Sequence, residues 1–430
     1  MARFWPLLPA LAVVALLTLP VDARAGGGTA ADAASALLVG WCAVRLVRLR
    51  ARPLSRAAAV LLGLPVAGIC AAAVTAYDPA VAAPGAVRHL QVFVLVPAAV
   101  VTLLRDRRDF AVLAGAVVAL ALFQGAVGTA QYLTGTGASY MGADVRAVGT
   151  FGPGDVMGMA TVVAYGLVVC VGLALTTRGR PRMAAYGCAG LLAVPLVLSF
   201  SRGAWIATAL ACAVQLVLTG ARRAARLALV AAALGVVLVA GLGVGSAQVE
   251  ERFASIARVA DAPDRSVTDR YTLWAAAGAM WRAEPVTGVG LKGFPAYRDS
   301  HASLALSSGS DTAGAGQAFR RQPLESPHNM YLLVLAEQGL LGLITVAAVW
   351  PALLVAGVRR LRRRRVAQQA VSPAGLVAVG LLGWQVVDFV YADIGGPTTV
   401  LTALVLGLAG WWVLGAGAAA GAEAGVRGDH

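Results

Sequence analysis

Two kinds of side chain in this sequence stand where they could do chemistry at a membrane surface. His328 follows a proline directly before a long apolar run, and the next residue, Asn329, can cap the coming helix. His328 should therefore stand at a helix entrance, where a titratable imidazole near the boundary of water and lipid could exchange protons. Arg202 and Arg270 each stand beside an apolar or aromatic stretch, where a guanidinium could pair with an anion.

Arg202 interrupts an apolar run from Met183 to Thr219 that is long enough for two membrane spans and too long for one. A guanidinium at the centre of a bilayer costs about 3 kcal/mol on insertion scales, so we expect Arg202 at the tip of a tight hairpin. The structural alternatives stay open. Arg202 could pair with a lipid phosphate, Arg270 could be an ordinary solvated helix residue, and His328 could only bond the loop backbone.

The composition is that of a polytopic membrane protein. Of the 430 residues, 59% are hydrophobic and 13% are charged, and apolar runs recur along almost the whole length. The net charge of +14 comes from arginine clusters between these runs, without the interleaved aromatic residues of a nucleic-acid-binding surface, so we expect no nucleic-acid partner. The five cysteines lie inside apolar runs without metal or disulfide spacing, and no metal site is expected.

Hydropathy predicts an all-α fold of about twelve transmembrane helices with one large extracytoplasmic loop. The arginine clusters fall in alternate loops, so the positive-inside rule places both termini in the cytoplasm. The hairpin Ser199 to Ala204 and the loop Ser246 to Pro327 then face outward. The predicted spans are residues 4–20, 33–47, 57–76, 88–104, 110–133, 157–176, 183–200, 203–219, 226–245, 330–356, 374–391 and 398–416.

These spans divide the chain into N-terminal helices (1–182), helices with the hairpin (183–245), the outer loop (246–328) and C-terminal helices (329–430). Within the loop, the pattern predicts a surface helix over 248–259 and a second helix that begins near Thr268 and Asp269 and ends at Glu284-Pro285. Trp274 lies on that second helix, as an aromatic anchor or as a platform for a sugar. A glycine-rich turn and a mobile stretch, Ser300 to Gln317, should follow.

Several short motifs in order resemble the family of O-antigen ligases and Wzy-type O-antigen polymerases. Each motif is short, and their order, spacing and predicted side of the membrane together carry the resemblance, over roughly Leu191 to Val355. The motifs are Ser201-Arg202-Gly203-Ala204, Arg270 with Trp274, Pro285 with Gly288, Gly290 and Phe294, and Pro327-His328-Asn329 with Leu332, Glu337, Gly339 and Gly342. The turn Gly149-Thr150-Phe151-Gly152 is also similar, although Asp155 stands where the family carries an asparagine.

This resemblance implies an inverting enzyme in the bacterial cytoplasmic membrane that needs no cofactor or metal. It would move a glycan from an undecaprenyl-pyrophosphate carrier to a hydroxyl of a glycan, lipid or protein acceptor at the outer face. Arg202 and Arg270 would hold the pyrophosphate and His328 would act as general base. We include Trp274 and Asn329 among the candidate substrate-binding residues, and membrane lipids among the partners.

Other functions remain open at this point. A transporter or flippase would share the number of spans, although the sequence lacks the long central loop of a protein built from two halves. A non-catalytic scaffold would use the outer loop only as an interface. Polymerisation and ligation are not distinguished, and a composition rich in Ala, Val, Gly and Arg tilts us toward an exopolysaccharide or cell-wall glycan. Glu337, Asp388 and Asp393 could each hold an arginine.

Overall fold

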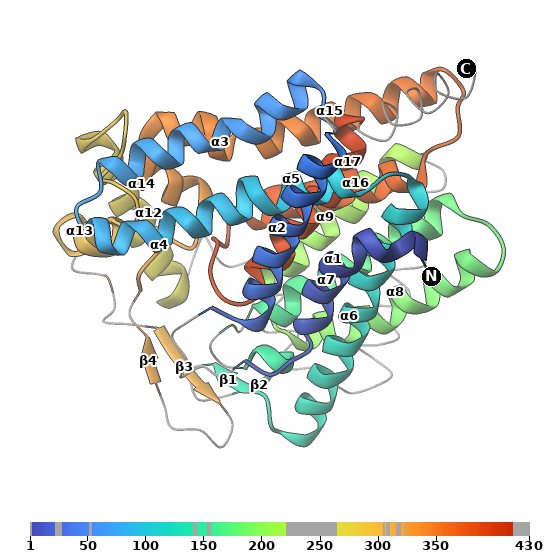
Figure 1. The fold of residues 1–430 in the computed structure, drawn as a ribbon. Coiled ribbons are helices and arrows are strands. Elements are labelled where there is room, and N and C mark those ends of the chain that lie inside the picture. Colours follow the sequence, from blue (N-terminus) through green and yellow to red (C-terminus); the bar gives the residue numbers. More distant parts are fainter. Residues whose placement is uncertain are drawn as a thin grey trace.

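The computed structural model is a bundle of long helices with a cap of short elements at one end (Figure 1). It describes residues 2–21, 28–50, 54–140, 144–152, 155, 157–220, 265–303, 306, 310–314, 320–322 and 324–415. The helices of the N-terminal half are α1 (Leu8–Leu16), α2 (Ala30–Leu49), α3 (Arg56–Val74), α4 (Pro79–Leu90), α5 (Val96–Leu103), α6 (Arg107–Thr134), α7 (Gly158–Thr176), α8 (Arg180–Leu198) and α9 (Arg202–Thr219). A π-helical turn, Gln91–Leu95, joins α4 to α5.

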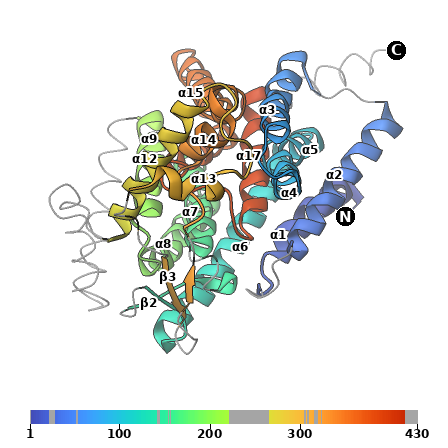
Figure 2. The same cartoon turned by 90° about the vertical axis from the view of Figure 1, so that its left-hand side faces the viewer.

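The C-terminal half contains two helices of the outer loop and four helices of the bundle. They are α12 (Arg265–Ala283), α13 (Phe294–His301), α14 (Met330–Gly342), α15 (Val349–Val366), α16 (Pro373–Asp388) and α17 (Thr399–Leu414). The π-helical segment Leu343–Ala347 makes α14 and α15 nearly continuous. Figure 2 shows α1 and α2 at one side of the bundle, and α8, α9 and α12 at the other.

Each predicted span that falls within the described residues coincides with a helix. Eight helices of the described part are long and apolar enough to cross a membrane, and the apolar helices Phe4–Leu16, α16 and α17 are shorter. The predicted span 226–245 and the predicted surface helix 248–259 lie outside the described residues. The membrane class is therefore confirmed, whereas the count of twelve, the extent of the large loop and the four-part division stay predictions.

The core lies around α7. Of its apolar stretch, 83% is buried inside the protein. Small residues allow its neighbours to approach closely: a Cβ atom at Gly166 would lie 2.3 Å from the Cβ of Ala121 on α6. On the other side, the amide of Gln215 on α9 donates to the carbonyls of Val168 on α7 and Leu376 on α16, both at 3.1 Å. Such hydrogen bonds from a side-chain amide satisfy polar groups in an interior without water, and they fix the three helices in register.

The connections that the arginine pattern assigns to the outer side gather at one end of the bundle. Four backbone hydrogen bonds join these connections or the helix ends beside them, from Val21 N to Thr150 O, Ala147 N to Leu198 O, Leu291 N to Ala72 O and Met330 N to Phe389 O. Where the structure describes both, one helical stretch separates each of these connections from the next arginine-rich one, so the described members of the two sets lie at opposite ends of the bundle. The orientation of this bundle in the membrane remains a prediction.

The all-α prediction is incomplete at this end, where the structure contains a four-stranded antiparallel sheet (Figure 1). Its order is β2-β1-β3-β4, with β1 (Ala138–Tyr140) and β2 (Asp144–Arg146) from the connection between α6 and α7, and β3 (Ser310–Gly314) and β4 (Arg320–Gln322) from the connection between α13 and α14. Ala138 of β1 pairs with Gly314 of β3. The stretch predicted to be mobile, Ser300 to Gln317, thus supplies one of these strands.

The second helix of the outer loop ends where the sequence predicted but begins earlier. α12 covers Arg265–Ala283, so Thr268 and Asp269 lie inside its first turns and do not cap it. The prediction failed because hydroxyl and carboxylate side chains near a helix start are a cap signal only when no helical residues precede them.

Candidate active site

His328 stands at the entrance of α14, as predicted. The Asn329 side chain accepts a 3.0 Å hydrogen bond from the N–H of Leu332 and so caps the helix, which fixes the chain direction immediately after His328. His328 itself has a φ of 47°, in the left-handed region that residues other than glycine seldom adopt. Its N–H donates to Ser326 Oγ at 3.3 Å. The surrounding structure thus holds a half-buried imidazole in an unfavourable backbone conformation, a feature typical of functional sites.

Trp274 of α12 holds this turn from the side. Its indole Nε1–H donates a 2.9 Å hydrogen bond to the carbonyl oxygen of Pro327, the residue before His328. The edge of the Tyr271 ring meets the Trp274 ring at 5.8 Å between centroids. The polar atom of Trp274 therefore joins α12 to the His328 turn.

Arg270 lies one turn before Trp274 on the same helix, close enough to His328 for the two to interact electrostatically. Burial is the main influence on the imidazole and lowers its pKa below the ordinary value of 6.5. Asp393 acts in the opposite direction and raises the pKa, whereas the charge of Arg270 lowers it further. The net result favours a neutral imidazole at neutral pH, which is the form that can accept a proton.

Asp393 belongs to the connection between α16 and α17, residues 389–398, which we call the acidic loop. Asp388, the last residue of α16, lies within electrostatic range of both Arg270 and Asp393. The loop is fixed to the His328 turn, because the N–H of Met330 donates to the carbonyls of Phe389 at 2.8 Å and Ala392 at 3.0 Å. For Asp388, the arginine that the sequence led us to expect is Arg270.

Arg202 approaches the same acidic loop from α9. It is the first residue of that helix, and Ser201 caps it by accepting from the N–H of Ala204 at 3.2 Å. A Cβ atom at Gly203 would lie 3.3 Å from the Cβ of Tyr391 in the acidic loop, so α9 packs directly against that loop. The structure thus places Arg270 and His328 in one charged cluster and brings Arg202 to the loop that borders this cluster.

Arg146 is a site neighbour that the sequence did not indicate. Its Nε donates to the carbonyl of Ser199 at 2.9 Å, at the end of α8, and the residue is buried. This bond satisfies a carbonyl that the helix leaves unpaired and fixes the hairpin that carries Arg202. The signal was absent from the sequence because Arg146 lies in a strand of another connection, far from the hairpin.

The glycine-rich turn serves to pack backbone against backbone. α14 is interrupted at Gly339, where φ is 62° and ψ is −159°, and the freed N–H of Leu340 donates to the carbonyl of Pro285 at 2.9 Å. In return, the N–H of Val289 donates to the carbonyl of Ala336 at 2.9 Å. Gly288 has a φ of 68°, and a Cβ atom there would lie 2.5 Å from the Ala336 oxygen. This close approach requires glycine.

Glu337 locks the same turn from α14. One carboxylate oxygen accepts from the N–H of Phe294 at 3.2 Å, and Lys292 supplies a nearby positive charge. Of the partners that the sequence left open, the structure shows a backbone N–H and the lysine that the turn brings near. Glu337 is only 2% exposed. Its hydrogen bond with Phe294 therefore holds the glycine-rich turn against α14 from the inside of the protein.

Residues 187–347 match a family model described as O-Antigen ligase. The match runs from α8 to the end of the π-helical segment and contains Arg202, Arg270 and His328, so the family resemblance drawn from the sequence is confirmed. The acidic loop lies outside it. No curated protein matches the chain.

Proposed function

We propose that this membrane protein with an O-antigen ligase domain transfers a glycan from an undecaprenyl-pyrophosphate carrier to an acceptor hydroxyl at the outer face of the cytoplasmic membrane. The family match supports a membrane glycan-processing function of the ligase or polymerase type. The observation that carries the finer proposal is the meeting of Arg270 and His328 beside the acidic loop, against which α9, the helix that Arg202 begins, also packs. A cation that could bind a diphosphate therefore lies near a neutral imidazole that could accept a proton from a hydroxyl.

In this mechanism, the acceptor oxygen attacks the anomeric carbon of the donor sugar. The bond from that carbon to the diphosphate oxygen breaks, and the carrier diphosphate leaves with the electron pair. His328 takes the proton of the acceptor hydroxyl as the new bond forms, a contribution of roughly 100-fold to 10,000-fold when the base is well placed. Attack from the face opposite the leaving group inverts the anomeric centre.

Arg202 and Arg270 would neutralise the charge that grows on the departing diphosphate. Two planar guanidiniums can do so through paired, charge-assisted hydrogen bonds, so the scheme has no step that needs a metal ion. Trp274 and Asn329 would lie beside the substrate, because both hold the turn that carries His328. The indole N–H donates a hydrogen bond to the Pro327 carbonyl, and the Asn329 side chain caps α14.

A deletion strain complemented with the wild type or with R202A, R270A or H328A tests this function. We expect each variant to reach the membrane at wild-type abundance and to leave the glycan unprocessed. Wild-type product from all three variants would contradict the proposal and favour a scaffold, whereas donor that stays on the inner leaflet would indicate a flippase. Loss of long chains with one repeat unit on the carrier would identify a polymerase, and full-length chains stranded on the carrier would identify a ligase.

A further inference from the structure

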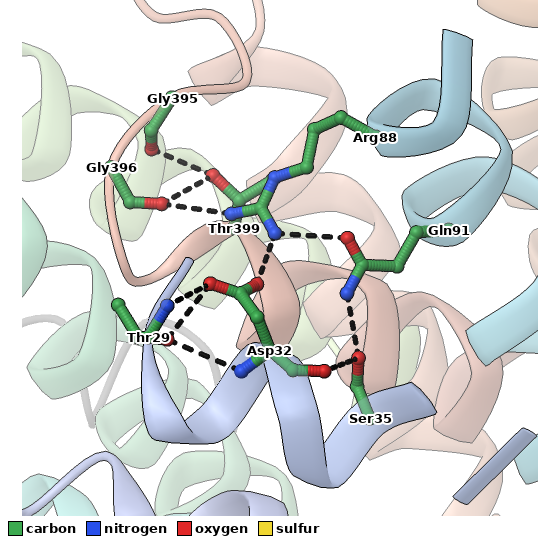
Figure 3. Close-up of polar contacts among 8 residues, drawn as sticks. All are labelled: Thr29, Asp32, Ser35, Arg88, Gln91, Gly395, Gly396 and Thr399. Carbon is green, nitrogen blue, oxygen red and sulfur yellow. Dashed lines mark hydrogen bonds and ion pairs between the residues drawn. The ribbon is translucent and has the colours of Figure 1, made fainter. Parts of the chain in front are cut away.

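Arg88 of α4 joins three parts of the chain (Figure 3), at the end of the bundle that the arginine pattern assigns to the outer side. One guanidinium nitrogen, Nη1, pairs with the carboxylate of Asp32 on α2 and donates to Gln91 Oε1 at 2.9 Å. The other, Nη2, donates to the carbonyl of Gly396 in the acidic loop at 3.0 Å. A single side chain thus links α2, α4 and the acidic loop.

The carboxylate that faces Arg88 is itself held in place (Figure 3). Asp32 accepts hydrogen bonds from the N–H of Thr29 at 2.7 Å and from its hydroxyl at 2.9 Å, and the Thr29 hydroxyl caps α2 in return. The amide of Gln91 donates to Ser35 Oγ at 2.6 Å, one turn further along α2. The network therefore leaves Arg88 little freedom, and its bond to the acidic loop has a defined direction.

A second group also holds the same part of the acidic loop. Thr398 Oγ1 donates to Asp155 Oδ2 at 3.0 Å, and a Cβ atom at Gly396 would lie 2.7 Å from that oxygen. Thr399 then closes the loop by donating to the Gly395 carbonyl at 2.6 Å. Both Arg88 and Asp155 thus hold the end of the acidic loop, and both lie outside the matched family region.

The other end of the acidic loop faces the candidate site. It accepts the N–H of Met330, packs Tyr391 against Gly203 and carries Asp393 beside His328. The contacts therefore run without a break from Arg88, through the loop backbone, to the residues next to Arg202 and His328.

We propose that Arg88 is a positioning residue for the glycan transfer: by holding the Gly396 carbonyl it fixes the acidic loop, and with it Asp393, against His328. This inference rests on the proposed function. It assigns to α2 and α4, which the family match does not cover, a part in the transfer. Misplacement of a reacting group by about 1 Å can cost about 100-fold in rate, so a released loop should be visible in the kinetics.

The charges around His328 determine how the pH dependence of activity should change when the acidic loop is released. Arg270 of α12 and Asp393 of the acidic loop act on His328 directly. Asp388 of α16 and Glu337 of α14 lie within electrostatic range of Asp393, and Arg202 is the first residue of α9, which packs against the loop at Tyr391. Release of the loop withdraws Asp393, the group that raises the pKa of His328. The pKa then falls, so the loss of activity on acidification moves to lower pH.

The test compares full-length wild type, R88Q and R88K in lipid nanodiscs with an undecaprenyl-pyrophosphate-linked glycan and an acceptor. For R88Q we expect faster amide hydrogen exchange confined to residues 389–398, a fall of at least about tenfold in kcat and the acid shift of the pH profile. R88K, which keeps a cation opposite Asp32, should recover part of the rate. R105Q is the matched control, because Arg105 pairs with Asp109 at 2.8 Å at the opposite end of the bundle.

Each result decides the proposal. Wild-type exchange over 389–398 in R88Q, or faster exchange with an unchanged rate and pH profile, overturns it. A fall in rate that R105Q reproduces without any change in the pH profile also overturns it, because that is the effect of general destabilisation. Failure of the proposed function can be told apart from failure of the role of Arg88. In that case the wild type would show no transfer, or H328A would transfer at the wild-type rate, whatever the rate of amide hydrogen exchange over residues 389–398.

Discussion

The indole N–H of Trp274 donates to the carbonyl oxygen of Pro327 at 2.9 Å, and this bond joins α12 to the turn that presents His328. Arg270 lies on α12 one turn away, so the same contact sets the distance between the cation and the imidazole. Trp274 thus links the two sequence motifs that carry the proposed chemistry.

Replacing Trp274 by phenylalanine keeps a ring and removes the donor. We expect W274F to lower kcat by about tenfold or more with a small change in KM, because the proposed base loses its position while most donor contacts remain. Initial rates over a range of donor concentrations measure this effect. W281F on the same helix is the control, since Trp281 Nε1 has no hydrogen-bond partner among the described residues. Equal effects of the two variants would show that the bond to Pro327 has no special role.

The pH profile should follow the state of His328. Burial and Arg270 lower its pKa below 6.5, so the imidazole stays neutral on acidification and activity is lost only as the pH falls through that lowered pKa. Asp393 raises this pKa, so D393N should move the acid limb of kcat/KM to still lower pH. D299N, at an exposed carboxylate paired with Arg298 at 2.7 Å, should leave the limb in place. A shift to higher pH in D393N would contradict the assignment.

Gly288 should tolerate no side chain. A Cβ atom would lie 2.5 Å from the Ala336 oxygen at a φ of 68°, so we expect G288A to lose about 1–3 kcal/mol of stability or more. Thermal unfolding in detergent, followed by intrinsic fluorescence, measures the loss. G278A, in the middle of α12, adds a methyl group that would meet only the Arg282 guanidinium at 3.8 Å and should be neutral or stabilising. Equal melting temperatures would show that the turn can relax.

The sequence allowed prediction of those features that depend on neighbouring residues. Apolar runs predicted the spans within the described residues. Pro327 and Asn329 predicted the entrance of α14, because a proline ends a helix and an asparagine caps one through local contacts alone. The contacts that build the site were not predictable in the same way. Trp274 and Pro327 are 53 residues apart, and Arg88 and Gly396 are 308 residues apart. No local pattern encodes such pairs.

The partners of the charged residues show the same limit. A buried Glu337 was expected to need a positive partner, but which one depended on a turn that folds back from Pro285 to Phe294. The β-sheet was missed because β1 and β3 are short strands from connections far apart, and each is stable only when paired with the other.

In the proposed transfer, His328 takes the proton of the acceptor, and Arg202 and Arg270 hold the diphosphate of the donor. The most direct measurement is single-turnover transfer, together with donor binding, by purified protein in nanodiscs with an undecaprenyl-pyrophosphate-linked glycan. We predict that H328A binds the donor with near wild-type affinity and transfers at least about 100-fold more slowly, while R202A and R270A lose donor affinity. Transfer by H328A at the wild-type rate, with inverted product, would contradict the account.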